Sequence, residues 1–192
     1  GGYLLLLNND TEMINDDCLN ELLSYTERDD VGITGARLLY EDNTVQHAGV
    51  VIGYNGLAGH TFVGNEPDDV GYHAYVIQAR DYSAVTAACL MVKASLYDEV
   101  GGFEEELEVA FNDVDFCLKV REKGYLVVYN PYAVLHHYES KSRGYEDTPE
   151  KRNRFEKEAF FTYNKWEKIL ADGDPCYNPN LTLSNSDFSL RE

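Results

Sequence analysis

A short, uninterrupted apolar run, Tyr3–Leu7, constrains the fold most, because it stops abruptly at three polar residues, Asn-Asn-Asp at 8–10. Crossing a bilayer takes about 20 apolar residues, so this run is too short for a membrane span. A continuous apolar run of this length is instead typical of a strand that is covered on both faces in an α/β sheet. We therefore predict a buried central strand whose carboxyl end presents two amides and a carboxylate.

The rest of the pattern predicts an α/β fold with a mixed central sheet that is flanked by helices. The turn-forming residues 41–43 join two strand-like segments and predict a hairpin, whereas Pro131 is expected to end the last strand. Residues 54–80, which mix Gly, Asn, Asp, Pro and His, are expected to form a long functional loop. Helices are predicted at 15–26, directly after 92, at 113–123 and at 148–170, and further strands at 31–40, 44–53, 84–92 and 125–129.

The length of 192 residues fits one domain, 1–192, in which residues 145–192 form a C-terminal helix and an extended tail that pack on the rest. The formal net charge of -18 should repel nucleic acid and anionic lipid, so neither is an expected partner. Such a charge either attracts divalent cations or serves only solubility.

Four scattered cysteines without metal-binding spacing indicate a reducing compartment. No stretch of the sequence is long and apolar enough to span a membrane, and no signal peptide is recognisable. Together these features predict a cytoplasmic chain without a transmembrane segment.

The first polar cluster, residues 8–10, allows two interpretations. Asp10 lies just beyond a rigid strand yet remains wet, and Mg²⁺ or Mn²⁺ prefers oxygen ligands of this kind, often together with substrate phosphates. Asn and Asp are also the commonest turn residues, so a plain turn is the simpler interpretation when the cluster is judged alone.

The second cluster, Asn112-Asp113-Val114-Asp115, falls at the start of a predicted helix. Because its two carboxylates are two residues apart, they point to different faces of that helix. Asp115 can form a surface ion pair with Lys119, one turn later. Asp113 can simply compensate the helix dipole, or it can act as a general base if a substrate hydroxyl comes within hydrogen-bonding reach.

The third cluster, residues 136–144, follows a predicted strand and combines two histidines with a carboxylate and two basic side chains. His136 and His137 are of a metal-ligand type, whereas Lys141 and Arg143 suit phosphate oxygens. A solvated polar loop is an equally good interpretation of this segment when it is judged alone.

Taken together and in order, these segments resemble the family 2 glycosyltransferases, which are inverting enzymes of the A-type nucleotide-sugar fold. The resemblance extends over essentially the whole chain and is strongest to a rhamnosyltransferase-like subgroup that builds bacterial surface polysaccharides. The segment LLLLNNDTE looks like the family's D-x-D motif in an N-x-D variant. The matching segments are LLLLNNDTE, GARLLYEDNTVQHAGVVIG, AVTAACLMVKASLYDEVGGFEEEL, FNDVDFCLKVREKGY and HYESKSRG.

The resemblance implies a divalent metal, Mn²⁺ or Mg²⁺, that bridges the diphosphate of the donor and is bound by Asp10 with the help of Asn8. His137 looks like the histidine that completes this metal site, and His136 is the competing assignment. Asp113 matches the aspartate of the family's E-D motif and would be the general base.

The implied substrates are a nucleotide-diphospho-sugar donor of the UDP or dTDP type and a glycan or lipid-linked acceptor. Such an acceptor would bring the protein to the inner face of the membrane. Asn112 stands where the family's motif has Glu, which changes the acceptor contacts expected of that position. The residues expected to contact donor or acceptor are Thr86, Asn112, Glu139, Ser140, Lys141 and Arg143.

In the family, a nucleotide-binding portion precedes the metal motif, whereas this chain starts just before that motif. We therefore expect the N-terminal part of a longer parent protein as a partner, and weak or absent turnover by this chain alone. One alternative is a non-catalytic carbohydrate-binding or assembly module that stacks some of its 15 tyrosines on sugars. A less supported alternative is a metal-dependent hydrolase that uses Asp10 and the two histidines.

Overall fold

The structure, a computed structural model, describes residues 1–138 and 148–191. Its helices are α1 Cys18–Thr26, α2 Ala94–Glu99, α3 Asn112–Glu122, α4 Pro149–Lys165 and α5 Glu167–Asp172, with 3-10 turns at Tyr54–Gly56 and Tyr72–Ala74. Its strands are β1 Tyr3–Leu7, β2 Thr11–Met13, β3 Val31–Leu39, β4 Val45–His47, β5 Val50–Ile52, β6 Ala58–His60, β7 Arg80–Asp81, β8 Cys89–Lys93 and β9 Leu126–His137.

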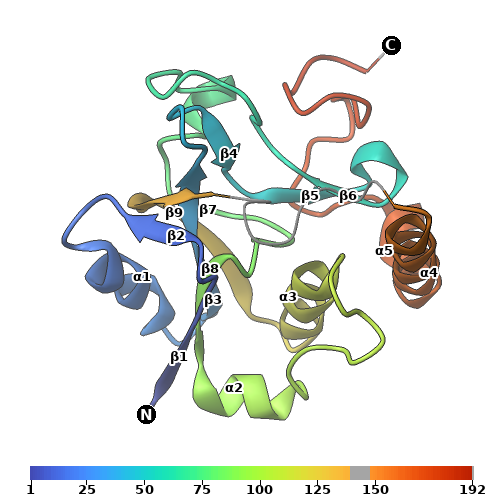
Figure 1. The fold of residues 1–192 in the computed structure, drawn as a ribbon, viewed down its shortest axis with the longest axis horizontal. Coiled ribbons are helices and arrows are strands. Elements are labelled where there is room, and N and C mark those ends of the chain that lie inside the picture. Colours follow the sequence, from blue (N-terminus) through green and yellow to red (C-terminus); the bar gives the residue numbers. More distant parts are fainter. Residues whose placement is uncertain (139–147, 192) are drawn as a thin grey trace.

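The central sheet is mixed, as predicted. Its main path has the strand order β1-β8-β3-β9-β2, and β4 and β7 are added on β3 and β9. β3 and β9 run parallel, whereas β8 is antiparallel to both β1 and β3. A second, two-stranded sheet of β5 and β6 lies beside it (Figure 1). The hairpin predicted around residues 41–43 is the antiparallel β3–β4 pair.

β1 forms with the predicted bounds, but it lies at the edge of the sheet and not in its centre, and it is only partly buried, with Tyr3 39% and Leu7 43% exposed. Among the described residues, β1 pairs only with β8, with Leu5 opposite Met91. Leu4 and Leu6 pack against one core and Leu5 against another, so both faces of the strand are in contact with apolar side chains. These contacts explain the apolar run, which by itself does not distinguish a central strand from an edge strand.

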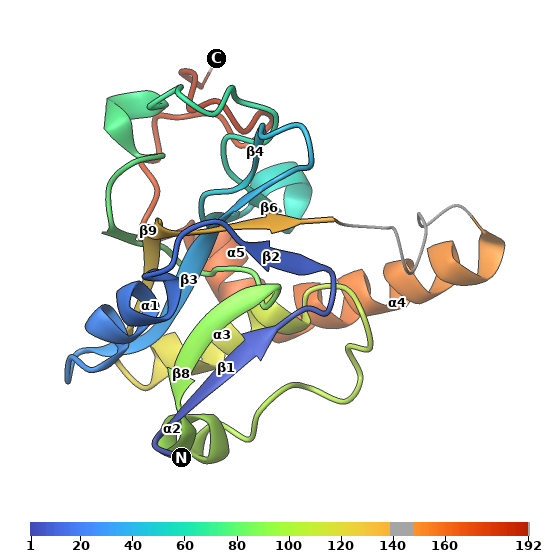
Figure 2. The same ribbon diagram turned by 60° about the vertical axis from the view of Figure 1, so that its left-hand side comes forward.

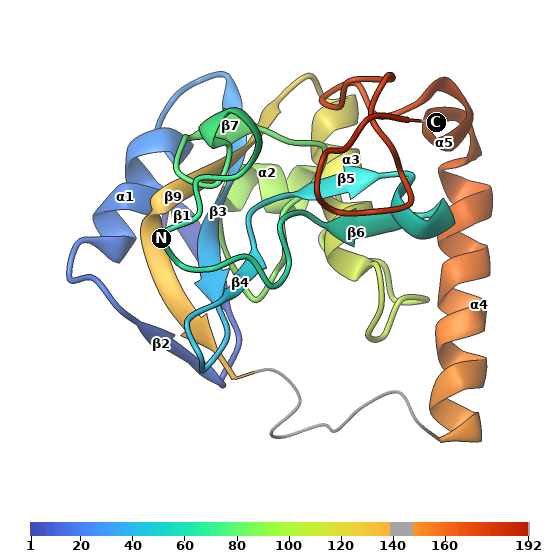
Figure 3. The same ribbon diagram turned by 90° about the horizontal axis from the view of Figure 1, so that it is seen from above.

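Helices cover both faces of the central sheet (Figures 1 and 3). On one face, Cys18 and Leu22 of α1 belong to a small core with residues of β3 and β8. On the other face, α3 contributes Phe116 to the larger core, and α4 lies beyond α3. Gly35 in β3 allows a close approach there, because a Cβ at this position would lie 2.5 Å from the Cβ of Val85.

The prediction that Pro131 ends the last strand is wrong, because β9 continues to His137. The register between β3 and β9 shifts after Asn130, which marks a bulge. Proline lacks an N–H, and a bulge is one of the places in a sheet where none is needed. Consequently, both neighbouring histidines lie on the strand and not in the loop that follows it.

The C-terminal region differs from the predicted single helix. The Thr148 hydroxyl caps α4 by accepting the Lys151 N–H at 3.3 Å, and Pro149 follows as the first residue of the helix. At Trp166, a φ of -112° interrupts the helix and separates α4 from α5. The tail then runs over the larger core, where Phe188 stacks on Phe62 with 4.6 Å between ring centroids. Residues 54–80, expected to be one loop, contain β6 and both 3-10 turns.

Two expectations from composition can be compared with the structure. None of the helices within residues 1–138 and 148–191 combines the length and the apolar character that a membrane span requires. The four cysteines are free thiols, three of them buried, and none forms a disulfide.

Candidate metal and catalytic site

The turn after β1 brings the first polar cluster to the end of β9. β2 follows this turn and pairs antiparallel with β9, with Thr11 opposite His137. The Tyr138 N–H continues the pairing by donating to the Asp10 carbonyl at 2.9 Å. His137 therefore lies beside Asn8, although 129 positions separate them in the sequence.

Three polar side chains converge at this point. His137 Nε2 lies 3.3 Å from Asp10 Oδ1 and 3.2 Å from Asn8 Nδ2. Asp10 Oδ1 is buried and has no hydrogen-bond partner among the residues that the structure describes. The Thr11 hydroxyl donates to the Asn8 carbonyl at 2.8 Å and fixes the turn. The two interpretations of residues 8–10 thus apply together, since the segment is a turn and its side chains meet His137.

Gln46, on β4, contacts both the backbone carbonyl and the ring Nδ1 of His137. The Gln46 Nε2 donates to the His137 carbonyl at 3.2 Å, which turns the Gln46 Oε1 toward His137 Nδ1, 2.7 Å away. An amide oxygen can only accept, so the proton of the neutral imidazole lies on Nδ1. His137 Nε2 then carries a lone pair, which accepts an N–H of the Asn8 amide at 3.2 Å and lies 3.3 Å from Asp10 Oδ1.

Two facing lone pairs repel each other unless a positive charge lies between them, either a proton or a bound cation. No group of three or more His, Cys, Asp or Glu side chains that could hold a metal ion exists among the described residues. Asp10, His137 and the Asn8 amide form a smaller donor set. Such a set suits Mg²⁺ or Mn²⁺, because these ions retain waters and substrate phosphates as further ligands.

The other histidine of the pair points elsewhere. His136 Nε2 lies 2.8 Å from Asn43 Oδ1, and its ring lies 5.9 Å from that of Tyr138. Neighbouring residues of a strand point to opposite faces, which explains the separation. The structure therefore places His137, and not His136, beside Asp10.

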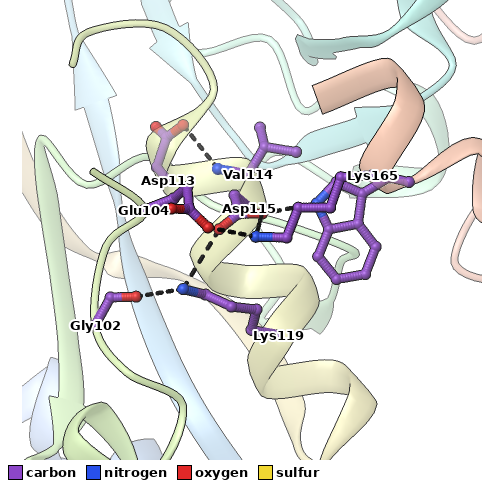
Figure 4. Close-up of polar contacts among 8 residues, drawn as sticks. Gly102, Glu104, Asp113, Val114, Asp115, Lys119 and Lys165 are labelled. Atoms are coloured by element: carbon purple, nitrogen blue, oxygen red, sulfur yellow. Dashed lines mark hydrogen bonds and ion pairs between the residues drawn. The ribbon is translucent and has the colours of Figure 1, made fainter. Parts of the chain in front are cut away.

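Asp113 lies in the first turn of α3 and is half-buried. Its Oδ1 accepts the Val114 N–H at 2.8 Å, and its Oδ2 accepts the Ala87 N–H at 3.2 Å. Figure 4 shows that Asp113 points away from Asp115, as the spacing of the two residues predicts. Backbone donors thus position a carboxylate that solvent can still reach.

The segment 84–88 connects Asp113 with the residues around His137. The Asn8 N–H donates to the Ala88 carbonyl at 3.0 Å, and the neighbouring Ala87 N–H donates to Asp113. Thr86 is buried, and its hydroxyl accepts the Ala88 N–H at 3.3 Å. The first and second polar clusters are therefore linked by hydrogen bonds to adjacent residues of one segment.

The prediction of a surface ion pair for Asp115 is wrong in its location, because this side chain is 0% exposed. Its carboxylate lies 2.8 Å from Lys165 Nζ, 2.9 Å from Trp166 Nε1 and 3.4 Å from Lys119 Nζ (Figure 4). The predicted Lys119 contact is thus the longest in a buried cluster. The cluster forms because the C-terminal helices pack on α3, which the spacing within α3 does not reveal.

α4 also supports the turn directly before Asp113. Phe111 has a left-handed φ of 61°, which is uncommon for a bulky residue. The buried Glu158 accepts the Ala110 N–H at 2.5 Å, and the Phe155 ring lies 5.5 Å from the Phe111 ring. These contacts fix the entry into α3 and, with it, the place of Asp113.

A groove of about 830 Å³ lies between α4 and the segment that leads into α3. Figure 2 shows α4 extending beyond the sheet. Phe160 on this helix is 70% exposed. Ring faces next to amides and carboxylates are suited to the apolar faces and hydroxyls of sugars. The lining of the groove includes Glu106, Glu108, Asn153, Phe160, Phe161 and Asn164.

Two residues near the site, Gln46 and His47, were not predicted to belong to it. His47 is fully buried, and its Nε2 accepts the Thr86 N–H at 3.4 Å. Burial, reinforced by the neighbouring His60 and His137, lowers the pKa of His47 well below its ordinary value. The available signal was a polar pair inside the otherwise apolar strand pattern of residues 44–53.

Several predicted contact residues have no described position. Glu139, Ser140, Lys141 and Arg143 lie outside the described residues, so their roles stay predictions. Asn112 is the first residue of α3, and no observation tests its expected contact with an acceptor.

Comparison with solved structures defines the fold class. The chain is similar to GalNAc-T7 in complex with UDP, GalNAc and Mn²⁺, with a TM-score of 0.64 and 12% identity over 90% of this chain and 33% of that one. It is also similar to the mannosyltransferase PcManGT from Pyrobaculum calidifontis, in complex with GDP-Man and Mn²⁺, with a TM-score of 0.54 and 15% identity over 88% and 40% of the two chains. The predicted fold class is confirmed, because the chain has part of the A-type fold of glycosyltransferases.

Sequence comparison shows that the chain is similar to parts of longer proteins. Protein y4gI of Sinorhizobium fredii is 49% identical over 99% of this chain, and the O-antigen biosynthesis protein RfbC of Myxococcus xanthus is 37% identical over 100% of it. The chain spans only 21% and 15% of these two proteins. An N-acetylglucosaminyl-diphospho-decaprenol L-rhamnosyltransferase of Mycobacterium tuberculosis is 35% identical over 60 residues, 31% of this chain and 20% of that protein. No family model matches the chain.

Proposed function

We propose that this chain is the metal- and acceptor-binding part of an inverting family 2 glycosyltransferase of bacterial surface-polysaccharide synthesis. The observation that carries the proposal is the meeting of Asp10 and His137 at one end of the sheet, with Asp113 linked to them through residues 84–88. The shared fold and the names of two relatives, an O-antigen biosynthesis protein and a rhamnosyltransferase, support sugar transfer as the reaction.

In this proposal, Asp10, His137 and Asn8 hold Mn²⁺ or Mg²⁺. The support from this chain is the buried Asp10 Oδ1, which has no hydrogen-bond partner within residues 1–138 and 148–191 and lies 3.3 Å from His137 Nε2. Such an ion, when bound, neutralises negative charge on the departing nucleoside diphosphate. Both solved neighbours contain Mn²⁺, which is consistent with this assignment.

Asp113 is the proposed general base. It takes the proton of the acceptor hydroxyl while that oxygen bonds to the anomeric carbon, and the bond from this carbon to the diphosphate breaks on the opposite face. The Val114 and Ala87 N–H groups hold the carboxylate in place for this transfer. Correct positioning of the hydroxyl and the base accounts for a large share of the rate in such reactions.

We assign the acceptor to the groove between α4 and the segment that leads into α3. Glu158 lines this groove and also binds the backbone of Ala110, three residues before Asp113. A sugar in the groove would therefore lie close to the proposed base. The exposed Phe160 ring offers an apolar surface on which a sugar ring can stack.

The donor in this proposal is a nucleotide-diphospho-sugar of the UDP or dTDP type, and the acceptor is a glycan or a lipid-linked glycan at the inner face of the membrane. The enzyme that carries out the transfer is a longer protein with a nucleotide-binding part before residue 1. The chain spans only 21% of y4gI and 15% of RfbC, which is consistent with a longer parent protein.

The test is a transfer assay on the longer parent protein with UDP- and dTDP-sugars and membrane-extracted acceptor. Asp113→Asn should lower the transfer rate by about 10²- to 10⁴-fold, since it removes the base but keeps the shape. Glu122→Gln, at the exposed far end of α3, is the control and should keep full activity. Full activity of Asp113→Asn would disprove the base assignment.

The groove also favours a second candidate, a non-catalytic carbohydrate-binding module. That function requires no metal and no base. Glycan binding by this chain in the presence of EDTA, together with a parent protein that transfers no sugar with or without Mn²⁺, would favour the binding module over the transferase.

A further inference from the structure

We infer that Gln46 is a positioning residue that selects the tautomer of His137 and thereby keeps the Nε2 atom beside Asp10 unprotonated. The inference rests on the proposed metal site, of which it names an additional component. Gln46 is not one of the proposed ligands, and its proposed role is exerted through its contacts with His137.

The contact has two points, which distinguishes it from an incidental hydrogen bond. Gln46 is 2% exposed, and its amide donates to the His137 carbonyl and accepts from the ring of the same residue, at 3.2 and 2.7 Å. The first contact fixes which end of the amide faces the ring. The second contact therefore presents an oxygen, and not an NH₂ group, to Nδ1.

The fold keeps Gln46 in this position. β4, which carries Gln46, pairs with β3 in the register Leu38↔His47, and β3 runs beside β9, where Leu39 lies opposite His136. The Gln46 backbone carbonyl is also engaged, because it lies 3.1 Å from His60 Nδ1. Gln46 is thus built into the sheet, unlike a residue on a surface loop.

The alternative tautomer would close the site. Without an acceptor at Nδ1, the His137 ring can carry its proton on Nε2 and donate it to Asp10 Oδ1, which already lies 3.3 Å away. This hydrogen bond from a neutral imidazole to the carboxylate would occupy both the nitrogen and the oxygen that a cation needs. In metal-binding histidines, the hydrogen bond made by one ring nitrogen generally determines that the other nitrogen is unprotonated and can bind the metal.

The first measurement is made on the metal-free chain, labelled with ¹⁵N, in two-bond ¹H–¹⁵N spectra at pH 8. The wild-type chain should show His137 protonated on Nδ1. Gln46→Met, which has a similar length but no acceptor oxygen, should move the proton to Nε2. Gln46→Glu keeps an acceptor for Nδ1 and should restore the wild-type tautomer.

The matched control is Asn43→Gly, which removes the side-chain partner of His136 and is compatible with the left-handed φ of 70° at this position. It should leave the His137 signals unchanged. An unchanged His137 tautomer in a folded Gln46→Met chain would overturn the inference. If Gln46→Met does not fold, Gln46→Leu takes its place in the same measurement.

The second measurement is Mn²⁺ binding, followed by the loss of the free-ion electron paramagnetic resonance signal. Gln46→Met should bind Mn²⁺ about 10- to 100-fold more weakly than the wild-type chain, and Gln46→Glu should recover most of the loss. Equal affinity in Gln46→Met would overturn the inference. Absence of Mn²⁺ binding by the wild type would instead refute the proposed metal site, while the tautomer result would still stand.

Discussion

At the scale of single residues, Asp113 and Asp115 show how two carboxylates on one helix acquire different surroundings. Asp115 is fully buried and surrounded by two ammonium groups and an indole N–H. Among the described residues, the hydrogen-bond partners of Asp113 are backbone donors, and its side chain remains half-buried. A group that takes up and releases a proton must be reachable by the substrate and by solvent. The half-buried Asp113 meets this condition, so it is the better candidate for a base.

Replacement of Asp10 tests the metal site directly. Asp10→Asn keeps the shape of the side chain but removes the charge, so the chain should lose at least 10-fold in Mn²⁺ affinity. Isothermal titration of Mn²⁺ into the chain measures this loss. Asp16→Asn, at an exposed position, makes the same change of net charge and should bind Mn²⁺ like the wild type. The same isotherm for both variants would exclude Asp10 as a ligand.

The buried His47 predicts a pH-dependent stability. Its pKa is lowered in the folded chain, so below about pH 6.5 the unfolded chain binds a proton that the folded chain does not. This residue therefore stabilises the fold fully above that pH and progressively less as the pH falls. Between pH 7.5 and 5.5, the wild type should lose about 1.4 kcal/mol more free energy of unfolding than His47→Gln.

Urea unfolding at the two pH values measures this difference. The exposed His73 provides the control, since His73→Gln should lose as much stability between the two pH values as the wild type. If His47→Gln and the wild type show the same dependence on pH, His47 is not the residue responsible.

Sequence reasoning worked best for residues whose partners are close in the chain. The turn at residues 8–10, the opposite directions of Asp113 and Asp115, and the Thr148 cap all follow from local spacing. It failed to identify Gln46, because the relevant partner, His137, is 91 positions away. It also left the choice between the two neighbouring histidines open, which depends on the direction of β9 and its pairing with β2.

At the scale of elements, the C-terminal helical region supports both the turn before α3 and the first turn of α3, which carries the proposed base. Glu158 and Phe155 contact the turn before α3, and Lys165 with Trp166 contacts Asp115 within it. The sequence predicts α4 as a helix with an exposed face, since charged residues dominate it. Which of its charges are buried depends on tertiary packing, and for the same reason the continuation of β9 through Pro131 was not predictable.

The Glu158 contact can be measured as stability. Glu158→Ala leaves the Ala110 N–H without its partner and should lower the free energy of unfolding by about 1–3 kcal/mol. Glu156→Ala removes an exposed carboxylate from the same helix and should change it by less than about 0.5 kcal/mol. Chemical denaturation followed by circular dichroism compares the two variants. Equal effects would mean that α4 does not support the turn through Glu158.

At the scale of the whole molecule, the chain corresponds to a part of larger proteins. It covers 33% and 40% of the two solved structures described above, and 21% and 15% of y4gI and RfbC. Within the described residues, β1 pairs on one side only, and its sequence contains neither a charge nor a proline. Such an edge is a suitable template for another strand. The whole-chain resemblance indicated the fold correctly, and four of its five segments lie entirely within the residues that the structure describes.

The last prediction concerns donor binding. If strands from a longer parent protein extend the sheet beyond β1, UDP or dTDP should bind at least 10-fold more tightly to the parent than to this chain, with Mn²⁺ present for both. Titration calorimetry gives the two affinities. In parallel, hydrogen exchange should show β1 amides that exchange readily in this chain and are protected in the parent, because a new strand would supply their hydrogen-bond partners. Equal nucleotide affinity together with equal β1 exchange would show that this chain already contains the complete donor site.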